Sequence, residues 1–242
     1  MTNKEAKVEK RIWQKIKYTL FEILPVWAWI PLIFEFMLNN LVYVGAKVIT
    51  ASWYHYNIES PIDLEIPFLP WTISIYFGCY VFWIVNYILC VRLGKERAWR
   101  FLGADFAAKL VCLICFLVFP TTNTRPEIIG TSIWDDLMRF LYSVDSADNL
   151  FPSIHCLTSW FCYIGIRGQK AIPRWYRTAS CVFALAVFVS TLTTKQHVLI
   201  DVAAGAALAE GMYWISGHTQ LAAVYGKAAE CVNRWIWKQT GI

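Results

Sequence analysis

Long apolar runs separated by short polar stretches dominate the hydrophobic pattern of this chain. A helix needs about 20 apolar residues to cross a hydrocarbon core of about 30 Å, and helices that pack together tolerate shorter runs. Six segments meet this requirement, although the fourth and fifth are short, and the third is also short unless it begins near Leu102. They are Leu24–Lys47, Trp71–Val91, Phe106–Phe119, Ile154–Ile166, Ala179–Leu192 and Val198–Ile215. The pattern predicts an all-α integral membrane protein, folded as a six-transmembrane-helix bundle.

Composition supports the prediction of a membrane protein and argues against other classes of protein. Hydrophobic residues make up 57% of the chain, charged residues make up 16%, and the mean hydropathy is +0.44. These values are too apolar for an ordinary soluble domain. The net charge of +5 does not indicate a nucleic-acid partner, because the basic residues form short clusters between apolar runs. Most cysteines lie inside apolar segments, which argues against a disulfide framework.

Lysine and arginine concentrate in alternate loops, and this orients the predicted bundle because such residues stay on the cytoplasmic side during insertion. The basic set is Lys4, Lys7, Lys10, Arg11, Lys15, Lys17, Arg92, Lys95, Arg97, Arg100, Arg167, Lys170, Arg174, Arg177, Lys227, Arg234 and Lys238. The opposite loops carry Glu59, Asp63, Glu65, Glu127, Asp135, Asp136, Asp145 and Asp148. We therefore expect a multi-pass protein of the cell membrane with both termini in the cytoplasm and the acidic loops outside.

A single membrane-embedded domain over residues 1–242 is the simplest organisation, because no internal repeat is evident. Residues 1–20 are expected to form a basic cytoplasmic arm, since the apolar run after them has no compact small-residue cleavage site. Residues 219–242 mix aliphatic, aromatic and basic side chains. This tail fits either an interfacial helix or a solvated cytoplasmic terminus. No pattern in the chain predicts an oligomeric state.

Two polar segments, 149–155 and 190–201, adjoin predicted helices on the outer side. Ionisable residues at membrane depth are costly, so they are functional candidates. His155 lies at the outer start of the fourth helix, where free N–H groups and the helix dipole favour an anion. Asp201 follows His197 by four residues and so returns to the same helical face. Its carboxylate can hold one imidazole nitrogen and leave the other free as a nucleophile.

Phosphoryl transfer depends on positioning and on stabilising charge on three equatorial oxygens. Arg125 can form a planar bidentate clamp, Ser153 offers a hydroxyl near a helix start, and Lys195 supplies a further cation. His155 is placed to protonate the leaving oxygen and then to accept a proton from water or an alcohol. The predicted catalytic residues are His197, His155 and Asp201, and the predicted substrate-binding residues are Arg125, Ser153 and Lys195.

These residues resemble the three motifs of the type 2 phosphatidic acid phosphatase (PAP2) superfamily, written K-x6-R-P, P-S-x-H and S-R-x5-H-x3-D. The matching residues are Arg125-Pro126, then Pro152-Ser153-Ile154-His155, then Ser190, His197 and Asp201 at the correct spacing. The resemblance covers roughly residues 118–201. It implies a six-helix bundle, a lipid phosphate substrate and a phosphohistidine mechanism that needs neither metal nor cofactor.

The chain departs from these motifs at two positions. Val118 occupies the place of the first motif's lysine, and Thr191 occupies that of the arginine after Ser190. Two expected phosphate-binding cations are therefore missing, and Lys195 would replace one of them. Loss of these cations also resembles the inositolphosphotransferase and sphingomyelin synthase-like branch, which passes a phospho-head group to an alcohol. Water and an alcohol both remain open as the acceptor.

Two other functional classes compete with this interpretation. Two histidines and a carboxylate can form a facial metal triad, but Arg125 and Lys195 would repel a metal and favour phosphate. The protein could also be a lipid-binding or transport bundle with a degenerate site. Other polar residues in the apolar runs are expected to form interhelical hydrogen bonds or, for Asp105 and Lys109, a local i, i+4 pair.

Overall fold

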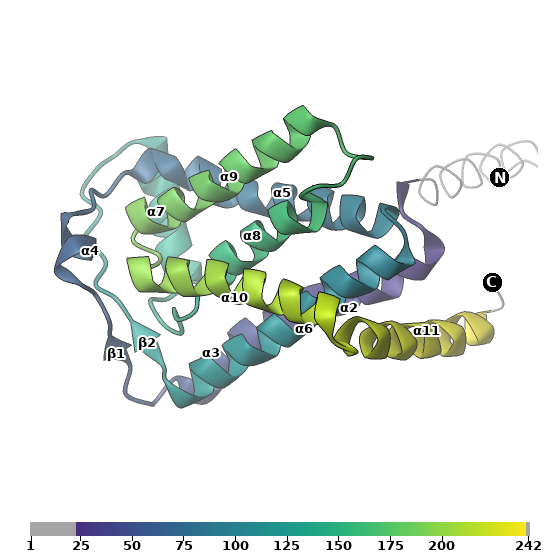
Figure 1. Cartoon of the computed structure of the whole chain (residues 1–242). Helices are drawn as coiled ribbons and strands as arrows, with labels where there is room; N and C mark the ends of the chain where they lie inside the picture. The colour runs from purple at the N-terminus through teal and green to yellow at the C-terminus, as the bar shows by residue number, and fades with distance from the viewer. Residues whose placement is uncertain (1–22, 241–242) are drawn as a thin grey trace, which may run out of the picture.

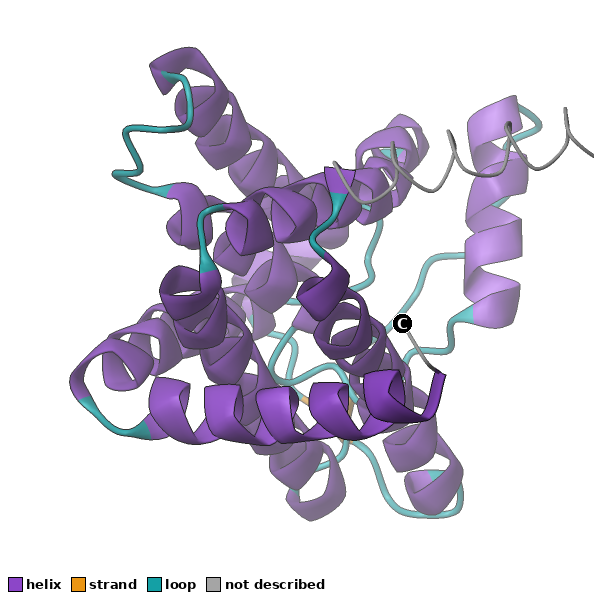
Figure 2. Ribbon diagram, turned by 90° about the vertical axis from the view of Figure 1, so that its right-hand side faces the viewer, coloured by secondary structure: helices purple, strands orange, loops and turns teal. Residues whose placement is uncertain are grey.

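The computed structural model describes residues 23–240, which are mostly helical (Figure 1). Figure 2 shows the same arrangement with one small pair of strands among the helices. The predicted N-terminal arm, residues 1–20, lies outside the described residues. The elements are η1 (Val26–Ala28), α2 (Trp29–Asn40), η2 (Leu41–Gly45), α3 (Ala46–Thr50), β1 (Tyr56–Asn57), α4 (Pro61–Glu65), η3 (Pro70–Thr72), α5 (Ile73–Arg92), α6 (Lys95–Val118), β2 (Thr121–Thr122), α7 (Ile133–Val144), α8 (Ile154–Ile166), α9 (Arg174–Thr193), α10 (Leu199–His218) and α11 (Leu221–Thr240).

All six predicted apolar segments are helical, and four helical stretches are long and apolar enough to cross a membrane. These four are Val26–Thr50, Pro70–Arg92, Lys95–Val118 and Arg174–Thr193. Helix α8 is apolar but shorter. The prediction of a mostly helical membrane protein is confirmed, and the number of six crossings stays a prediction.

Two helices begin before the apolar runs that predicted them, because basic residues form their first turns. Helix α6 begins at Lys95, after Gly94 with φ +104°, and α9 begins at Arg174. Backbone hydrogen bonding continues through these basic first turns although their side chains are not apolar. The first long stretch is interrupted by the π-helical turn η2, a feature that hydropathy does not reveal.

One end of the bundle carries short elements that the sequence pattern did not predict. Figure 1 shows α4, α7 and the β1–β2 pair together there, and α11 with the α8–α9 loop at the opposite end. Capping boxes start both short helices, with Ser60 and Asp63 in α4 and Ser132 and Asp135 in α7. A capping box satisfies two of the free N–H groups of a first turn. These loops are therefore ordered structure and contribute to the site described below.

Helix α6 is the centre of the packing, and α2, α5, α8, α10 and α11 all contact it. Its inner face presents the small, fully buried side chains of Ala104, Ala108 and Cys112, which let neighbouring helices approach closely. The C-terminal tail is helical from Leu221 and packs along α6, with the ring centroids of Tyr225 and Trp99 6.2 Å apart. The tail is helical, and whether it lies at the membrane surface or in the cytoplasm stays a prediction.

A buried ionic cluster joins four helices in the interior of the bundle. The Lys109 Nζ lies 2.8 Å from Asp105 Oδ2 and 3.5 Å from Glu35 Oε2. Tyr87 donates a hydrogen bond to Asp105 (2.7 Å), and Tyr225 donates one to Glu35 (2.7 Å). The predicted i, i+4 pair is confirmed, and the cluster ties α2, α5 and α11 to α6.

Candidate active site

The His197–Asp201 pair lies where the α9–α10 loop enters α10. Asp201 is fully buried, and its Oδ2 accepts a hydrogen bond from the Val198 N–H (3.0 Å). The same oxygen lies 3.4 Å from His197 Nδ1. A proton on Nδ1 can therefore be held by the carboxylate, which leaves Nε2 with its lone pair. His197 is only 8% exposed, so this pair is shielded from bulk solvent.

One hydrogen bond and one close backbone approach at Gly205 hold the start of α8 against the first turns of α10. The Ser153 N–H donates to the Asp201 carbonyl oxygen (3.1 Å), and the Ser153 hydroxyl caps α8 by accepting from the Cys156 N–H (3.2 Å). Gly205 makes the approach possible, because a Cβ there would lie 2.6 Å from the Ser153 carbonyl oxygen. As a result, the rings of His155 and His197 face one cavity with their centroids 5.8 Å apart.

Aromatic side chains of α5 surround His155. Its ring centroid lies 4.6 Å from that of Tyr76 and 5.6 Å from that of Trp83, and its Nε2 is 3.4 Å from the Tyr80 hydroxyl. Sequence reasoning did not single out these three residues. Their spacing of four and three residues places them on one face of a helix, and this was the signal that could have found them.

Arg125 lies behind the cavity wall and is held on both sides of its guanidinium. One nitrogen donates to the Asp145 carbonyl oxygen, the other donates to Gln196 Oε1 (2.9 Å), and the guanidinium carbon lies 4.5 Å from the Tyr142 ring centroid. The Asp145 carboxylate in turn accepts hydrogen bonds from Tyr43 and Tyr76. Arg125 is not among the residues that line the cavity, so it contacts the site through Asp145 and Gln196, which do line it.

Lys195 is not brought into the cavity either. Its backbone is left-handed (φ +53°), and its Nζ donates to the Asp63 carbonyl oxygen at 2.8 Å. The Asp63 carboxylate accepts hydrogen bonds from Ser60 and from the Leu199 N–H (2.7 Å). Burial alone would raise the pKa of Asp63, but these hydrogen bonds and the Lys195 charge outweigh it and hold the pKa below 3.8. The hydrogen bond from Lys195 to Asp63 therefore connects the α9–α10 loop, which carries His197, to α4.

The two positions that lack the motif cations have other surroundings. Val118 ends α6 with 78% of its surface exposed, so the residue faces away from the core. The Thr191 hydroxyl donates to the Phe188 carbonyl oxygen (2.8 Å) within its own helix. Neither residue lines the cavity that holds the histidines.

A cavity of about 410 Å³ opens at His155 and His197. This volume lies within the range of about 300–1,000 Å³ typical of small-molecule sites. Its other polar lining residues are Asn39, Asn40, Asp145, Asp148, Asn149 and Gln196, and apolar side chains of η2, α5 and α7 complete the wall. The exposed side chains of Val44, Phe140 and Val144 belong to this apolar part. The cavity lining thus combines polar and apolar side chains.

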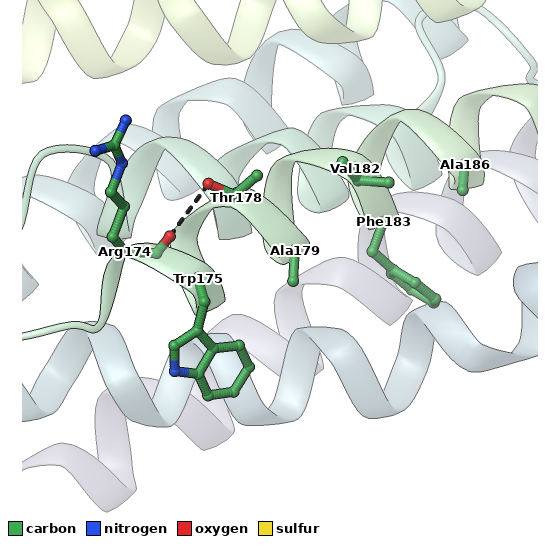
Figure 3. Close-up of a pocket in the computed structure, with 7 residues that line it drawn as sticks. All are labelled: Arg174, Trp175, Thr178, Ala179, Val182, Phe183 and Ala186. Atoms are coloured by element: carbon green, nitrogen blue, oxygen red, sulfur yellow. Dashed lines mark hydrogen bonds between the residues drawn. The ribbon is translucent and has the colours of Figure 1, made fainter.

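A second hollow, a groove of about 700 Å³, follows α9 and holds no histidine (Figure 3). Figure 3 shows Trp175, Val182 and Phe183 along it, with Arg174 as the one charged side chain drawn. Although this groove is larger, a reaction needs groups that can bind and move protons. The cavity at His155 and His197 is therefore the candidate active site.

Histidine and aspartate side chains line the cavity, but their arrangement does not form a metal-binding group in the part of the chain that the structure describes. Within residues 23–240, no group of three or more His, Cys, Asp or Glu side chains could hold a metal ion. The Asp201 Oδ2 faces its own helix start and His197 Nδ1. The donor arrangement that a facial triad requires is thus not present among these residues.

Fold and site define a helical membrane protein in which a buried His–Asp pair and a second histidine share one cavity. The PAP2 superfamily matches this chain over residues 48–215, more than half of its length. The chain belongs to the PAP2 superfamily. Comparisons with curated proteins and with solved structures gave no match. Members of this superfamily are generally phosphatases or related phosphotransferases, so membership indicates an activity of that type.

Proposed function

We propose that the protein is a membrane lipid phosphate phosphatase that hydrolyses a lipid phosphomonoester or diphosphate through a phosphohistidine on His197. The observation that carries this proposal is the shared cavity of His197 and His155, with Asp201 Oδ2 3.4 Å from His197 Nδ1. A carboxylate that holds Nδ1 leaves Nε2 as the nucleophile. The second histidine supplies the acid and base that the two steps need.

In the first step, His197 Nε2 attacks phosphorus in line with the leaving oxygen. The P–N bond forms, the P–O bond to the lipid breaks, and protonated His155 gives its proton to the leaving oxygen. In the second step, water attacks phosphorus, His155 takes a proton from that water, and the P–N bond breaks to release phosphate. Asp201 stabilises the positive charge on the His197 ring throughout. This sequence of bonds balances without a metal or a cofactor.

The phosphate would be held mainly by dipoles of the protein. Ser153 caps α8, and the first free N–H groups of a helix attract an anion. Arg125 adds a positive charge behind the Gln196 wall. Lys195 adds a more distant positive charge, because its Nζ is bound to the Asp63 carbonyl oxygen.

Membrane orientation follows from the separation of charged loops. We propose six crossings with both termini in the cytoplasm and the histidines on the extracytoplasmic side. The acidic α4 and α7 elements and the basic α8–α9 loop lie at opposite ends of the bundle (Figure 1), which agrees with the rule that basic loops stay inside. Lipid chains would enter sideways past Val44, Phe140 and Val144, which are exposed on the apolar side of the cavity.

Replacement of each histidine by alanine tests the proposal directly. His197→Ala should abolish phosphate release from a panel of lipid phosphates, and His155→Ala should lower it by about 10²- to 10⁴-fold. Vanadate should inhibit the wild-type protein competitively. The matched control is His218→Ala, because His218 is exposed at the far end of α10. Wild-type rates in His197→Ala, or no acid-labile phosphate on the wild-type protein after a quench during turnover, would refute the mechanism.

A phospho-head-group transferase is the second candidate, and the cavity wall favours it. Asp145, Asp148 and Asn149 line the same cavity as the histidines, and carboxylates accept hydrogen bonds from the hydroxyls of an alcohol. Assays with and without inositol or diacylglycerol separate the two activities, because a transferase forms a new phosphodiester instead of free phosphate. Loss of activity on chelation and its return with added metal would instead indicate a metal-dependent hydrolase.

A further inference from the structure

The cavity lacks a cation in direct contact with a bound phosphate, judged on residues 23–240. Lys195 is bound to the Asp63 carbonyl oxygen, and Arg125 lies behind the lining residues. The motif positions that would carry cations are occupied by Val118 and Thr191, outside the cavity. Phosphoryl transfer nevertheless needs donors directed at the equatorial oxygens. Side chains that line the cavity can supply such donors in addition to the first N–H groups of α8.

Gln196 lines the cavity next to His197 and is only 2% exposed. Its Oε1 accepts a hydrogen bond from Arg125 at 2.9 Å. Its Nε2 is buried and has no hydrogen-bond partner among the described residues. Because a guanidinium has only donors, Arg125 fixes which end of the amide is the oxygen. The nitrogen is thereby held on the other side with both hydrogens available.

We infer that Gln196 is a catalytic residue whose Nε2 donates a hydrogen bond to a non-bridging phosphoryl oxygen during transfer to His197. Arg125 is then a positioning residue that orients and polarises the Gln196 amide without touching the phosphate. This inference rests on the proposed function, because it assumes that phosphorus binds at His197. It explains how the site works without the two motif cations, since a buried, oriented donor replaces a mobile positive charge.

The physical basis is the cost of a buried donor without an acceptor. A buried amide N–H is costly to leave without an acceptor, and Gln196 Nε2 has no acceptor among the described residues. A phosphoryl oxygen that enters the cavity relieves this cost and gains a donor that needs no reorganisation. Removal of one such donor typically lowers the rate by about 10²- to 10³-fold.

Orthovanadate binding to the purified full-length protein tests the inference without knowledge of the natural lipid. Gln196→Ala should weaken vanadate binding by about 10²-fold. Gln196→Glu keeps an oxygen for Arg125 but places a second oxygen where the donor was, so its binding should weaken at least as much. The matched control is Gln220→Ala, since Gln220 is exposed before α11 and should bind as the wild type does.

The glutamate variant has no donor at this position but keeps an oxygen for Arg125. Wild-type vanadate binding in Gln196→Glu would therefore overturn the inference, whereas its loss also reflects repulsion between the new carboxylate and vanadate. Arg125→Ala should weaken binding too, and adding Gln196→Ala to it should have little further effect, because the two residues act in series. Additive losses would show that Arg125 binds the phosphate directly.

Failure of the proposed function gives a different result. If the wild-type protein binds no vanadate, or if His197→Ala binds it equally well, the proposed function falls and the inference falls with it. If His197→Ala abolishes binding while both Gln196 variants retain it, only the inference is wrong. Thermal unfolding of each variant in the same detergent checks that it is folded, and Gln196→Glu serves if Gln196→Ala is not.

Discussion

Gly205 permits the contact that brings the two histidines together, so Gly205→Ala should damage the site more than the fold. The added Cβ would lie 2.6 Å from the Ser153 carbonyl oxygen and 3.2 Å from the Leu157 nitrogen. Both atoms belong to the first turn of α8, the turn that carries His155. That turn has to move by at least 0.4 Å to restore the 3.0 Å below which real Cβ contacts essentially never occur.

The stability change should be small because two effects oppose each other. Alanine gains about 1 kcal/mol over glycine in a helix interior, whereas overpacking of a filled site costs about 1–3 kcal/mol. The net loss should therefore be about 0–2 kcal/mol. Activity is more sensitive, since a displacement of about 1 Å can cost about 10²-fold in rate. A shift of at least 0.4 Å should lower turnover about tenfold.

The assay compares two alanine variants of the same helix. A Cβ at Gly211 meets no atom within 4 Å, so Gly211→Ala should gain stability and retain the wild-type rate. Initial rates are measured on the lipid phosphate that the wild-type protein turns over fastest, and thermal unfolding is followed in the same detergent. If Gly205→Ala gains stability like Gly211→Ala and keeps full turnover, the α8–α10 contact does not position the histidines and the reasoning fails.

Two further predictions concern stability. Lys109→Met leaves two buried carboxylates without their cation and should lower the free energy of unfolding by about 3–5 kcal/mol. Lys95→Ala removes an exposed ion pair and should lower it by about 0–1 kcal/mol. Equal melting temperatures of the two variants would contradict this prediction. The pKa of Asp63 is held below 3.8, so its contribution is complete above that pH and is lost as the pH falls below it. Asp63→Asn should therefore have a lower melting temperature than the wild type at neutral pH, and this difference in melting temperature should shrink in acid. A difference that stays constant with pH would argue against the Leu199 contact as its source.

Local features of the chain were predictable because they depend on residues close in sequence. The four-residue spacing of His197 and Asp201 determines that both lie on one face of a helix start, and the structure places them 3.4 Å apart. The Asp105–Lys109 pair follows the same rule at 2.8 Å. The apolar runs likewise predicted the four helical stretches that are long and apolar enough to cross a membrane, and the motif spacing indicated the superfamily that residues 48–215 match.

Contacts between distant segments were not predictable in this way. The sequence predicts both Arg125 and Lys195 as phosphate-binding cations, but the loop packing turns one toward Gln196 and the other toward Asp63. The aromatic surroundings of His155 come from α5, and the third member of the ionic cluster, Glu35, comes from α2.

The difference between the features that were predictable from the sequence and those that were not has a physical reason. Spacing within a helix is set by the geometry of 3.6 residues per turn, so the sequence by itself determined the helices and the His197–Asp201 pair. Which side chains meet across helices depends on how closely the backbones can approach, as at Gly205, where a Cβ would lie 2.6 Å from the Ser153 carbonyl oxygen. Only the tertiary structure therefore decided that His155 joins the pair and that Gln196, instead of a cation, lines the cavity.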